Sequence, residues 1–123
     1  MNIDFQDALD AFKRDDCETA YKILLRLAEH GDPKAQFFLG ELYFVGKGVQ
    51  HDYGEAAGWY RLAAEQGVAG AQCKLGEMLS KGLGGQQDCE EAAKWFKLAA
   101  EQGHAEAQKR AWEWEPKSSK SAN

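Results

Sequence analysis

The sequence contains little proline and little cysteine, and it has no long hydrophobic run. Only two prolines and three cysteines occur among the 123 residues. An odd number of cysteines (Cys17, Cys73 and Cys89) without short, regular spacing indicates neither a disulfide framework nor a zinc site, so we expect reduced thiols used as small hydrophobic residues. The scarcity of proline, together with abundant alanine and leucine, favours a helical protein.

Basic residues are also few, and acidic residues outnumber them. With 15 Lys and Arg against 20 Asp and Glu, the formal net charge is -5, which argues against a nucleic-acid partner because phosphate contacts need clustered cations. No apolar stretch is long enough for membrane insertion. The first ten residues lack the basic region and apolar stretch of a signal peptide. We therefore expect a cytoplasmic protein; a periplasmic or secreted location stays open if a leader preceded these residues.

The chain repeats itself with a period of 36 residues. Residues 35–70 align with residues 71–106, so that, for example, Asp52 and Gly67 recur as Asp88 and Gly103. The period extends in both directions beyond these two segments. A repeat of this length is typical of solenoids built from helical hairpins.

Capping residues and glycines divide each repeat into two helices. Asp32 and Pro33 are typical of a helix start, Asp52 and Glu55 have the spacing of a capping box, and Gly67 fits a left-handed C-cap. The helices that we expect lie near residues 4–14, 17–30, 34–45, 53–66, 70–81, 89–102 and 105–114.

Two features of the repeat predict how the helices pack. Gly40 and Gly76 lie in the middle of a helix, where glycine costs about 1 kcal/mol relative to alanine, so we expect the partner helix to approach closely there. Trp59 and Trp95 occupy equivalent positions in the second helix. We expect both indole rings to be mostly buried between neighbouring hairpins.

The repeat has a specific pattern, A-x-x-x-L-G-x-x-Y-x-x-G-x-G-V-x-x-D-x-x-x-A-x-x-W-Y-x-x-A-A-x-x-G, which matches Ala35 to Gly67 nearly throughout. It resembles the Sel-one-like repeat (SLR), a relative of the tetratricopeptide repeat; the second copy departs from it at Leu79, Gly85 and Phe96. The resemblance implies an all-α solenoid of antiparallel helical hairpins. Its expected parts are a single domain 1–115 with hairpins at about 4–31, 34–67 and 70–103 and a capping helix at 105–114, followed by a disordered polar tail at 116–123.

The glycine-rich loops of the repeat are expected to have a structural role and not to bind phosphate. Gly46 to Gly48, and their counterparts Gly82 to Gly85, lack the spacing of a phosphate loop and follow no strand. No side chains form a recognisable catalytic or metal-binding pattern, and we expect no cofactor. Some cysteine-rich secreted SLR proteins have been proposed to bind or cleave β-lactams. Their paired cysteines are missing here, so a β-lactam-binding or hydrolytic protein is the weakest alternative.

The resemblance further implies a concave face, lined by the first helix of each hairpin, and a non-catalytic adaptor or scaffold that binds a peptide or partner protein there. The groove has an aromatic N-terminal half and a polar C-terminal half. Alternatively, Phe5, Phe12 and Phe37 pack between hairpins. The residues expected to be exposed in the groove and to bind the partner are Phe5, Leu9, Phe12, Phe37, Glu41, Phe44, Cys73, Glu77, Ser80, Lys81, Lys109 and Glu113.

The C-terminal end of the repeats carries two tryptophans. Trp112 and Trp114 are two residues apart, so on a helix they point to nearly opposite sides. If one ring seals the last hairpin, the other is exposed and could support weak self-association. A structural or oligomerising module is therefore the second functional alternative.

Overall fold

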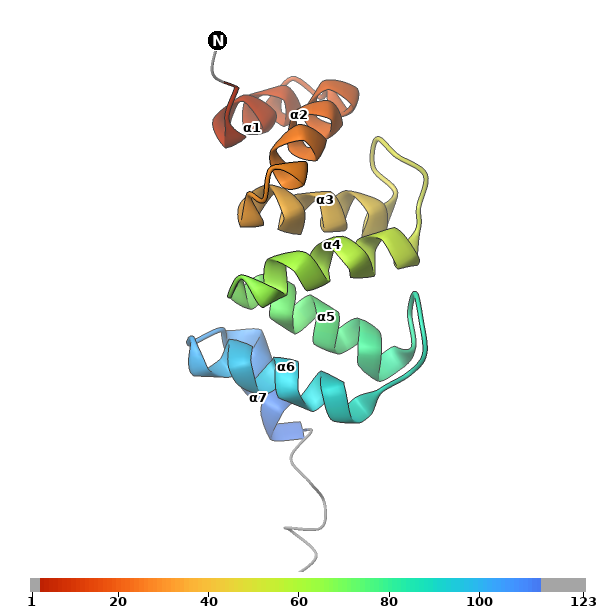
Figure 1. Ribbon diagram of the computed structural model, residues 1–123, viewed down its shortest axis with the longest axis vertical. Coiled ribbons are helices and arrows are strands. Elements are labelled where there is room, and N and C mark those ends of the chain that lie inside the picture. Colours follow the sequence, from red (N-terminus) through yellow and green to blue (C-terminus); the bar gives the residue numbers. More distant parts are fainter. Residues whose placement is uncertain (1–2, 114–123) are drawn as a thin grey trace, which may run out of the picture.

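The computed structural model describes the backbone of residues 3–113 and the side chains of residues 3–109. Figure 1 shows the helices stacked along the long axis of the molecule, in chain order from one end to the other. Each begins and ends within one residue of the range predicted from the sequence. The helices are α1 (Phe5–Lys13), α2 (Cys17–Glu29), α3 (Pro33–Val45), α4 (Tyr53–Glu65), α5 (Ala69–Lys81), α6 (Cys89–Glu101) and α7 (Ala105–Glu113).

Aspartate side chains begin most of these helices. In α4, for example, the Asp52 carboxylate accepts a hydrogen bond from the backbone N–H of Glu55 (3.1 Å), which satisfies a donor that has no partner inside the helix. The expected return bond from the Glu55 side chain does not form. The Asp52 N–H instead donates to the carbonyl of Tyr43 (3.0 Å) and so ties the loop to the preceding helix.

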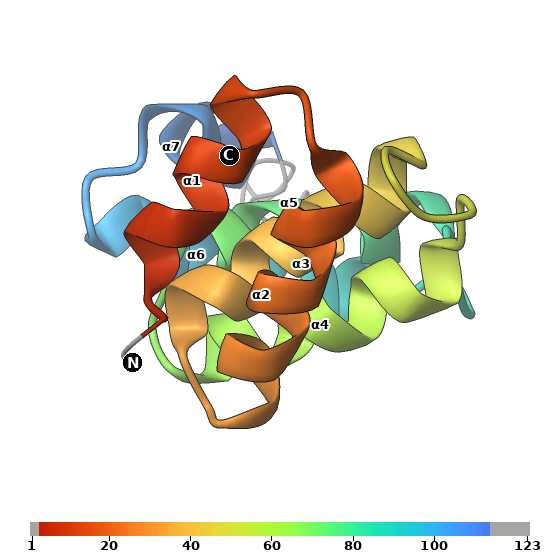
Figure 2. The same cartoon turned by 90° about the horizontal axis from the view of Figure 1, so that it is seen from above.

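The helices pack mainly onto their neighbours in the chain, as a stack of hairpins does and a closed bundle does not. Seen from above, α5 and α7 lie toward one side of the stack and α4 toward the other (Figure 2). The two long loops, residues 46–52 and 82–88, lie one above the other along one edge (Figure 1). The expected all-α solenoid is confirmed.

One aromatic ring fills the centre of the second hairpin and one the centre of the third; the equivalent residue of the first is Leu24. Tyr60 and Phe96 are 0% exposed, and each ring lies against the mid-helix glycine of the partner helix. A Cβ atom placed on Gly40 would lie 2.8 Å from the Tyr60 ring, and one on Gly76 would lie 2.9 Å from the Phe96 ring. The close approach expected at these glycines is therefore present, and the atoms that approach belong to a ring.

The two tryptophans of the repeats are equivalent but are not the central rings. Trp59 packs against the hydrophobic cluster that includes Leu39, and Trp95 packs against the next cluster, which includes Leu75. Both indoles are only partly buried. They cover the edges of the interfaces, whereas the residue after each tryptophan fills the middle.

A pair of glutamines links each hairpin to the next helix. Buried Gln36 donates from Nε2 to the carbonyl of Ala28 (3.1 Å) and accepts a hydrogen bond from Nε2 of Gln66 (2.8 Å). One repeat later, Gln72 donates to the carbonyl of Ala64 (3.1 Å) and accepts from Gln102 (3.0 Å). The same clasp thus closes two successive interfaces.

The clasp predicts that Gln72→Met lowers the free energy of unfolding by about 1–2 kcal/mol, because two hydrogen bonds worth about 1 kcal/mol each are lost while the shape is nearly kept. Urea unfolding followed by circular dichroism measures the change. Gln108→Met is the control, because exposed Gln108 makes one such bond, to Ala100 (3.2 Å). An equal loss in the two variants would show that burial of the clasp adds nothing.

Candidate functional site: a groove between α3, α5 and α7

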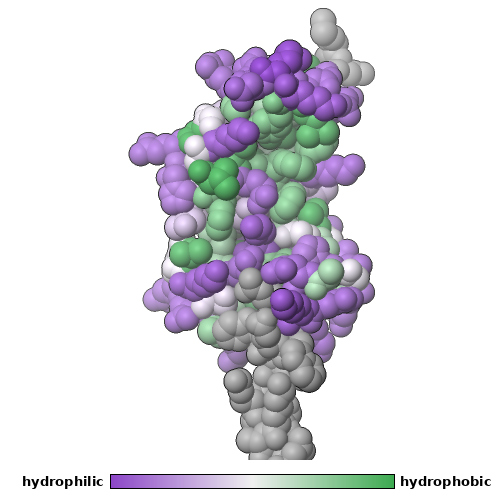
Figure 3. Space-filling view, turned by 180° about the vertical axis from the view of Figure 1, so that it is seen from behind, coloured by the Kyte–Doolittle hydropathy of each residue, from purple (hydrophilic) through white to green (hydrophobic). Residues whose placement is uncertain are grey.

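A hollow of about 320 Å³ opens on the face formed by α3, α5 and the start of α7. On the side of the molecule opposite to the view in Figure 1, hydrophobic side chains gather on the upper half, toward the N-terminus (Figure 3). The residues that line the hollow are Phe37, Gly70, Cys73, Lys74, Glu77, His104 and Glu106. It therefore joins one aromatic wall to a charged rim.

The aromatic wall is Phe37, whose ring is shared between the core and the groove. The centre of its ring lies 5.5 Å from that of Phe38 and 5.9 Å from that of Tyr60. The ring also covers Gly70, where a Cβ atom would lie 3.2 Å from it. Helix α3 packs against both α2 and α4, so its own aromatic side chains point to several sides of it. The Phe37 ring lies at the edge of the packed part.

Lys74 crosses the groove from α5 to α3. Its Nζ atom lies 5.0 Å from the centre of the Phe44 ring, a distance at which an ammonium group is attracted to the face of an aromatic ring. The Phe44 ring in turn packs against Tyr53, at 5.3 Å between centres. This contact holds a positive charge above an apolar surface at the rim of the groove.

An acidic side chain next to Phe37 on α3 accepts a hydrogen bond from a buried phenol. The hydroxyl of Tyr60 donates a hydrogen bond to the Glu41 carboxylate. Burial, and then this bond to Glu41, raise the pKa of Tyr60 above its usual range, so the phenol remains a donor at neutral pH. Glu41 lies one turn after Phe37 on α3 but does not itself line the hollow; the bond from Tyr60 holds its carboxylate in one position beside it.

The residues expected in the groove differ in how far they reach the surface. Lys81 and Lys109 are exposed. The partly buried ones are Phe5, Leu9, Phe12, Phe37, Glu41, Phe44 and Glu77. The four phenylalanine rings are therefore neither fully exposed nor fully buried. Each packs on other side chains and leaves part of its surface accessible to solvent.

Two of the expected groove residues are buried, so the expectation of their exposure is wrong. Cys73 is 3% exposed because it packs into a cluster with Phe96 and Ala107, although one edge of it lines the hollow. Ser80 is 7% exposed; it lies close to the loop after α5, where Gln87 donates to its carbonyl (2.7 Å). The side chain of Glu113 lies outside the described residues, as do the Trp112 side chain and Trp114.

Lys74, His104 and Glu106 line the hollow but were not among the residues expected there. His104 occupies the position that Asp32 holds two repeats earlier, and its Nδ1 accepts a hydrogen bond from the N–H of Ala107 (3.1 Å). A histidine in place of a capping aspartate could have indicated that the start of α7 differs from the start of α3. Nothing in the spacing alone places Lys74 in the groove, because its counterpart in the previous repeat is the packed Phe38.

The described residues offer little sign of other chemistry. Among the side chains of residues 3–109, no group of three or more His, Cys, Asp or Glu could hold a metal ion, and Cys17, Cys73 and Cys89 are free thiols. The same part of the chain has no helix that is both long and apolar enough to cross a membrane.

Comparisons with known proteins match the repeats directly. Residues 33–68 and 69–104 each match the model of the Sel1 repeat. No curated protein matches the sequence. Several solved structures do, and the similarity extends over most of this chain.

Three solved structures illustrate the similarity. A Sel1 repeat protein from Oxalobacter formigenes is 37% identical over 88% of this chain and 44% of its own, with a TM-score of 0.82. The protective antigen c5321 of uropathogenic Escherichia coli, which displays an SLR fold, is 33% identical over 84% of this chain and 23% of its own, with a TM-score of 0.80. Cysteine-rich protein B of Helicobacter pylori, at 24% identity over 82% and 77% and a TM-score of 0.74, shares the fold. The chain spans less than half the length of the first two.

Proposed function

Because the chain belongs to the Sel1 repeat family, we propose that it is a non-catalytic adaptor that binds a peptide or a segment of a partner protein in the groove between α3, α5 and α7. Sel1 repeats generally mediate protein interactions and are typically non-catalytic. The observation that carries the proposal is the hollow of about 320 Å³, in which the half-buried ring of Phe37 faces charged side chains of α5 and α7.

The groove fits a segment with one apolar side chain and a neighbouring cation. An apolar group placed on Phe37 would remove ring surface from water, at about 25 cal/mol for each Å². A lysine or arginine of the segment would pair with Glu41, whose carboxylate the Tyr60 hydroxyl already holds in place. Such a pair of contacts is the usual form of segment recognition in a groove, with an apolar anchor for affinity and polar groups for orientation.

We expect Phe37→Ala to reduce partner capture at least tenfold, because the variant loses the apolar wall of the groove. Immobilised wild-type protein and variants are incubated with a lysate of the cells that express the protein, and bound proteins are quantified by mass spectrometry. Tyr21→Ala is the matched control: Tyr21 is also a partly buried aromatic residue, but it lies on α2, away from the groove.

Melting curves of both variants verify that each is folded at the temperature of the assay. Proteins bound by the wild type and by Tyr21→Ala, but lost from Phe37→Ala, would support binding in the groove. Equal capture by all three proteins would mean that the partner uses another surface.

A further inference from the structure

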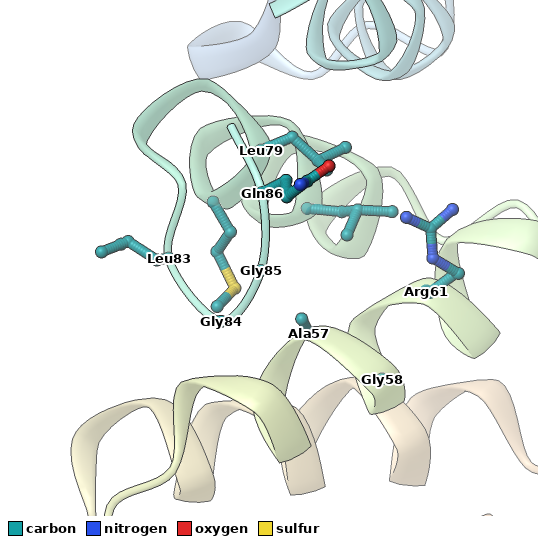
Figure 4. A pocket seen from close by; sticks show the side chains of 10 residues that line it. Ala57, Gly58, Arg61, Leu79, Leu83, Gly84, Gly85 and Gln86 are labelled. Carbon is teal, nitrogen blue, oxygen red and sulfur yellow. The ribbon is translucent and has the colours of Figure 1, made fainter. Parts of the chain in front are cut away.

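A second hollow, of about 250 Å³, lies on a different part of the molecule, between α4, α5 and the loop that follows α5. In Figure 4 this loop, with Gly84 and Gly85, stands opposite Ala57 and Gly58 of α4. Five of the ten lining residues have apolar side chains, and Arg61 and Gln86 lie at the rim. The apolar wall residues are Ala57, Leu75, Met78, Leu79 and Leu83.

The same place one repeat earlier is occupied by two tyrosines. Moving back by 36 residues, Ala57 becomes Tyr21 and Leu79 becomes Tyr43. The hydroxyl groups of these tyrosines lie 3.0 Å apart, and their rings meet edge to face with 6.1 Å between centres. The pair therefore places two phenol rings beside the loop, where the second repeat has alanine and leucine.

The missing rings change the depth of the hollow. The first repeat has a wider surface hollow of about 570 Å³, lined by Tyr21 and Tyr43, and the core residue Leu42 is not part of its lining. In the second repeat the equivalent core residue, Met78, and Leu75 line the hollow. With alanine and leucine in place of the tyrosines, the hollow extends down to the core.

At the rim of the hollow, Arg61 can donate hydrogen bonds to a polar group of a bound ligand. Arg61 replaces Leu25 of the previous repeat, and its Nη1 is paired with a carboxylate oxygen of Glu91 (2.7 Å), which also accepts a hydrogen bond from Nε1 of Trp95 (3.0 Å). These bonds from Arg61 and then Trp95 lower the pKa of Glu91, so the carboxylate stays charged and holds the guanidinium in place. A guanidinium can stack on a ring or donate to a hydroxyl with its remaining N–H groups.

We propose that this hollow binds the phenol side chain of a tyrosine from a partner protein, where the rings of Tyr21 and Tyr43 lie one repeat earlier. Its size is sufficient, since an apolar cavity of about 150 Å³ already binds benzene. The ring contacts Leu75 and Met78, and its hydroxyl reaches Arg61 or Gln86. The proposal rests on the proposed adaptor function, but it concerns a surface that does not include Phe37.

The test is a nuclear magnetic resonance titration with N-acetyl-tyrosinamide, with N-acetyl-leucinamide as the control ligand. We expect the tyrosine compound to bind with a dissociation constant on the order of millimolar and to shift the amide signals of Gly84, Gly85 and Gln86. Nuclear Overhauser contacts between its ring and the Met78 methyl group would place the ring in the hollow of the wild-type protein. No binding, or equal binding of the leucine compound, would overturn the proposal.

A variant in which larger side chains fill the hollow provides a second test of the proposal. Ala57→Tyr with Leu79→Tyr copies the pair of the first repeat and should weaken binding of N-acetyl-tyrosinamide at least tenfold. Leu62→Tyr, which adds a phenol at an exposed position of α4, should leave it unchanged. Binding that persists in the filled variant would overturn the proposal; if that variant does not fold, the ring contacts to Met78 in the wild type decide.

The two functional proposals fail independently. Phe37→Ala should bind the tyrosine compound as the wild type does, so a failure in the titration leaves the groove untouched. In the lysate assay, the filled variant should capture at least one wild-type partner tenfold less. Capture of every partner at the wild-type level by the filled variant would overturn the assignment of the tyrosine to a partner protein.

Discussion

Replacing Phe96 by alanine is expected to lower the free energy of unfolding by about 3–5 kcal/mol, the usual cost of removing a large buried ring. The Phe96 ring is 0% exposed and lies against Gly76, so the helices α5 and α6 cannot close the resulting space without moving their backbones. Domains of this kind have a total stability of about 5–15 kcal/mol. The expected decrease is therefore a large fraction of the total stability. Urea unfolding at 25 °C measures it.

The control lies two residues further along the same helix. Leu98 is 45% exposed, and Leu98→Ala should cost less than about 1 kcal/mol, because little surface returns to water. Similar losses in the two variants would show that Phe96 is not the central residue of this hairpin. Trp95→Ala should fall between them, since the indole is only partly buried.

The arrangement of helices could be predicted from the sequence because its signals are local. Asp52 and Asp88 begin helices by binding backbone N–H groups one turn away, and Gly46 ends α3 in the left-handed conformation (φ 75°). Such signals act over three or four residues and depend little on tertiary packing. The period of 36 residues then indicates that the same hairpin is built again.

The faces of the helices were harder to predict, and α3 shows why. Apolar residues surround this helix because α2 and α4 pack on different sides of it, so the sequence marks no single buried face. Phe37 was expected in the groove, with packing between hairpins as the alternative, and the structure divides its ring between the two. In α5, the burial of Cys73 depends on α6 and α7, which lie 16 or more residues away in the chain. Ser80 contacts Gln87 of the following loop and Cys89 at the start of α6, which are 7 and 9 residues away.

Which aromatic residue of α4 is buried at the centre of the hairpin could not be predicted from neighbouring residues in the sequence either. Trp59 is larger than Tyr60, and hydrophobicity alone favours the tryptophan as the buried residue. The deciding feature is Gly40, nineteen or twenty residues earlier, which leaves room for a ring at Tyr60 on the facing helix. A glycine that lowers helix propensity is thus explained by the residue that packs on it.

Because Tyr60 packs on Gly40, a glycine-to-alanine change there should alter the free energy of unfolding in the opposite direction to the same change at exposed Gly58. Gly40→Ala should lower the free energy of unfolding by about 1–3 kcal/mol, as overpacking in a core does, because the new Cβ atom would lie 2.8 Å from the Tyr60 ring. Gly58→Ala should raise it by about 0.4–1 kcal/mol, because Gly58 is exposed within α4 and a Cβ atom there meets nothing within 4 Å.

Alanine favours helix at both positions by about 1 kcal/mol relative to glycine, so propensity alone predicts that both variants are stabilised. The difference between them isolates the packing of the Tyr60 ring on Gly40. Urea unfolding of the two variants beside the wild type measures it. If Gly40→Ala proved as stabilising as Gly58→Ala, the ring could shift without cost, and the close contact would not be the reason why glycine stands in the middle of α3.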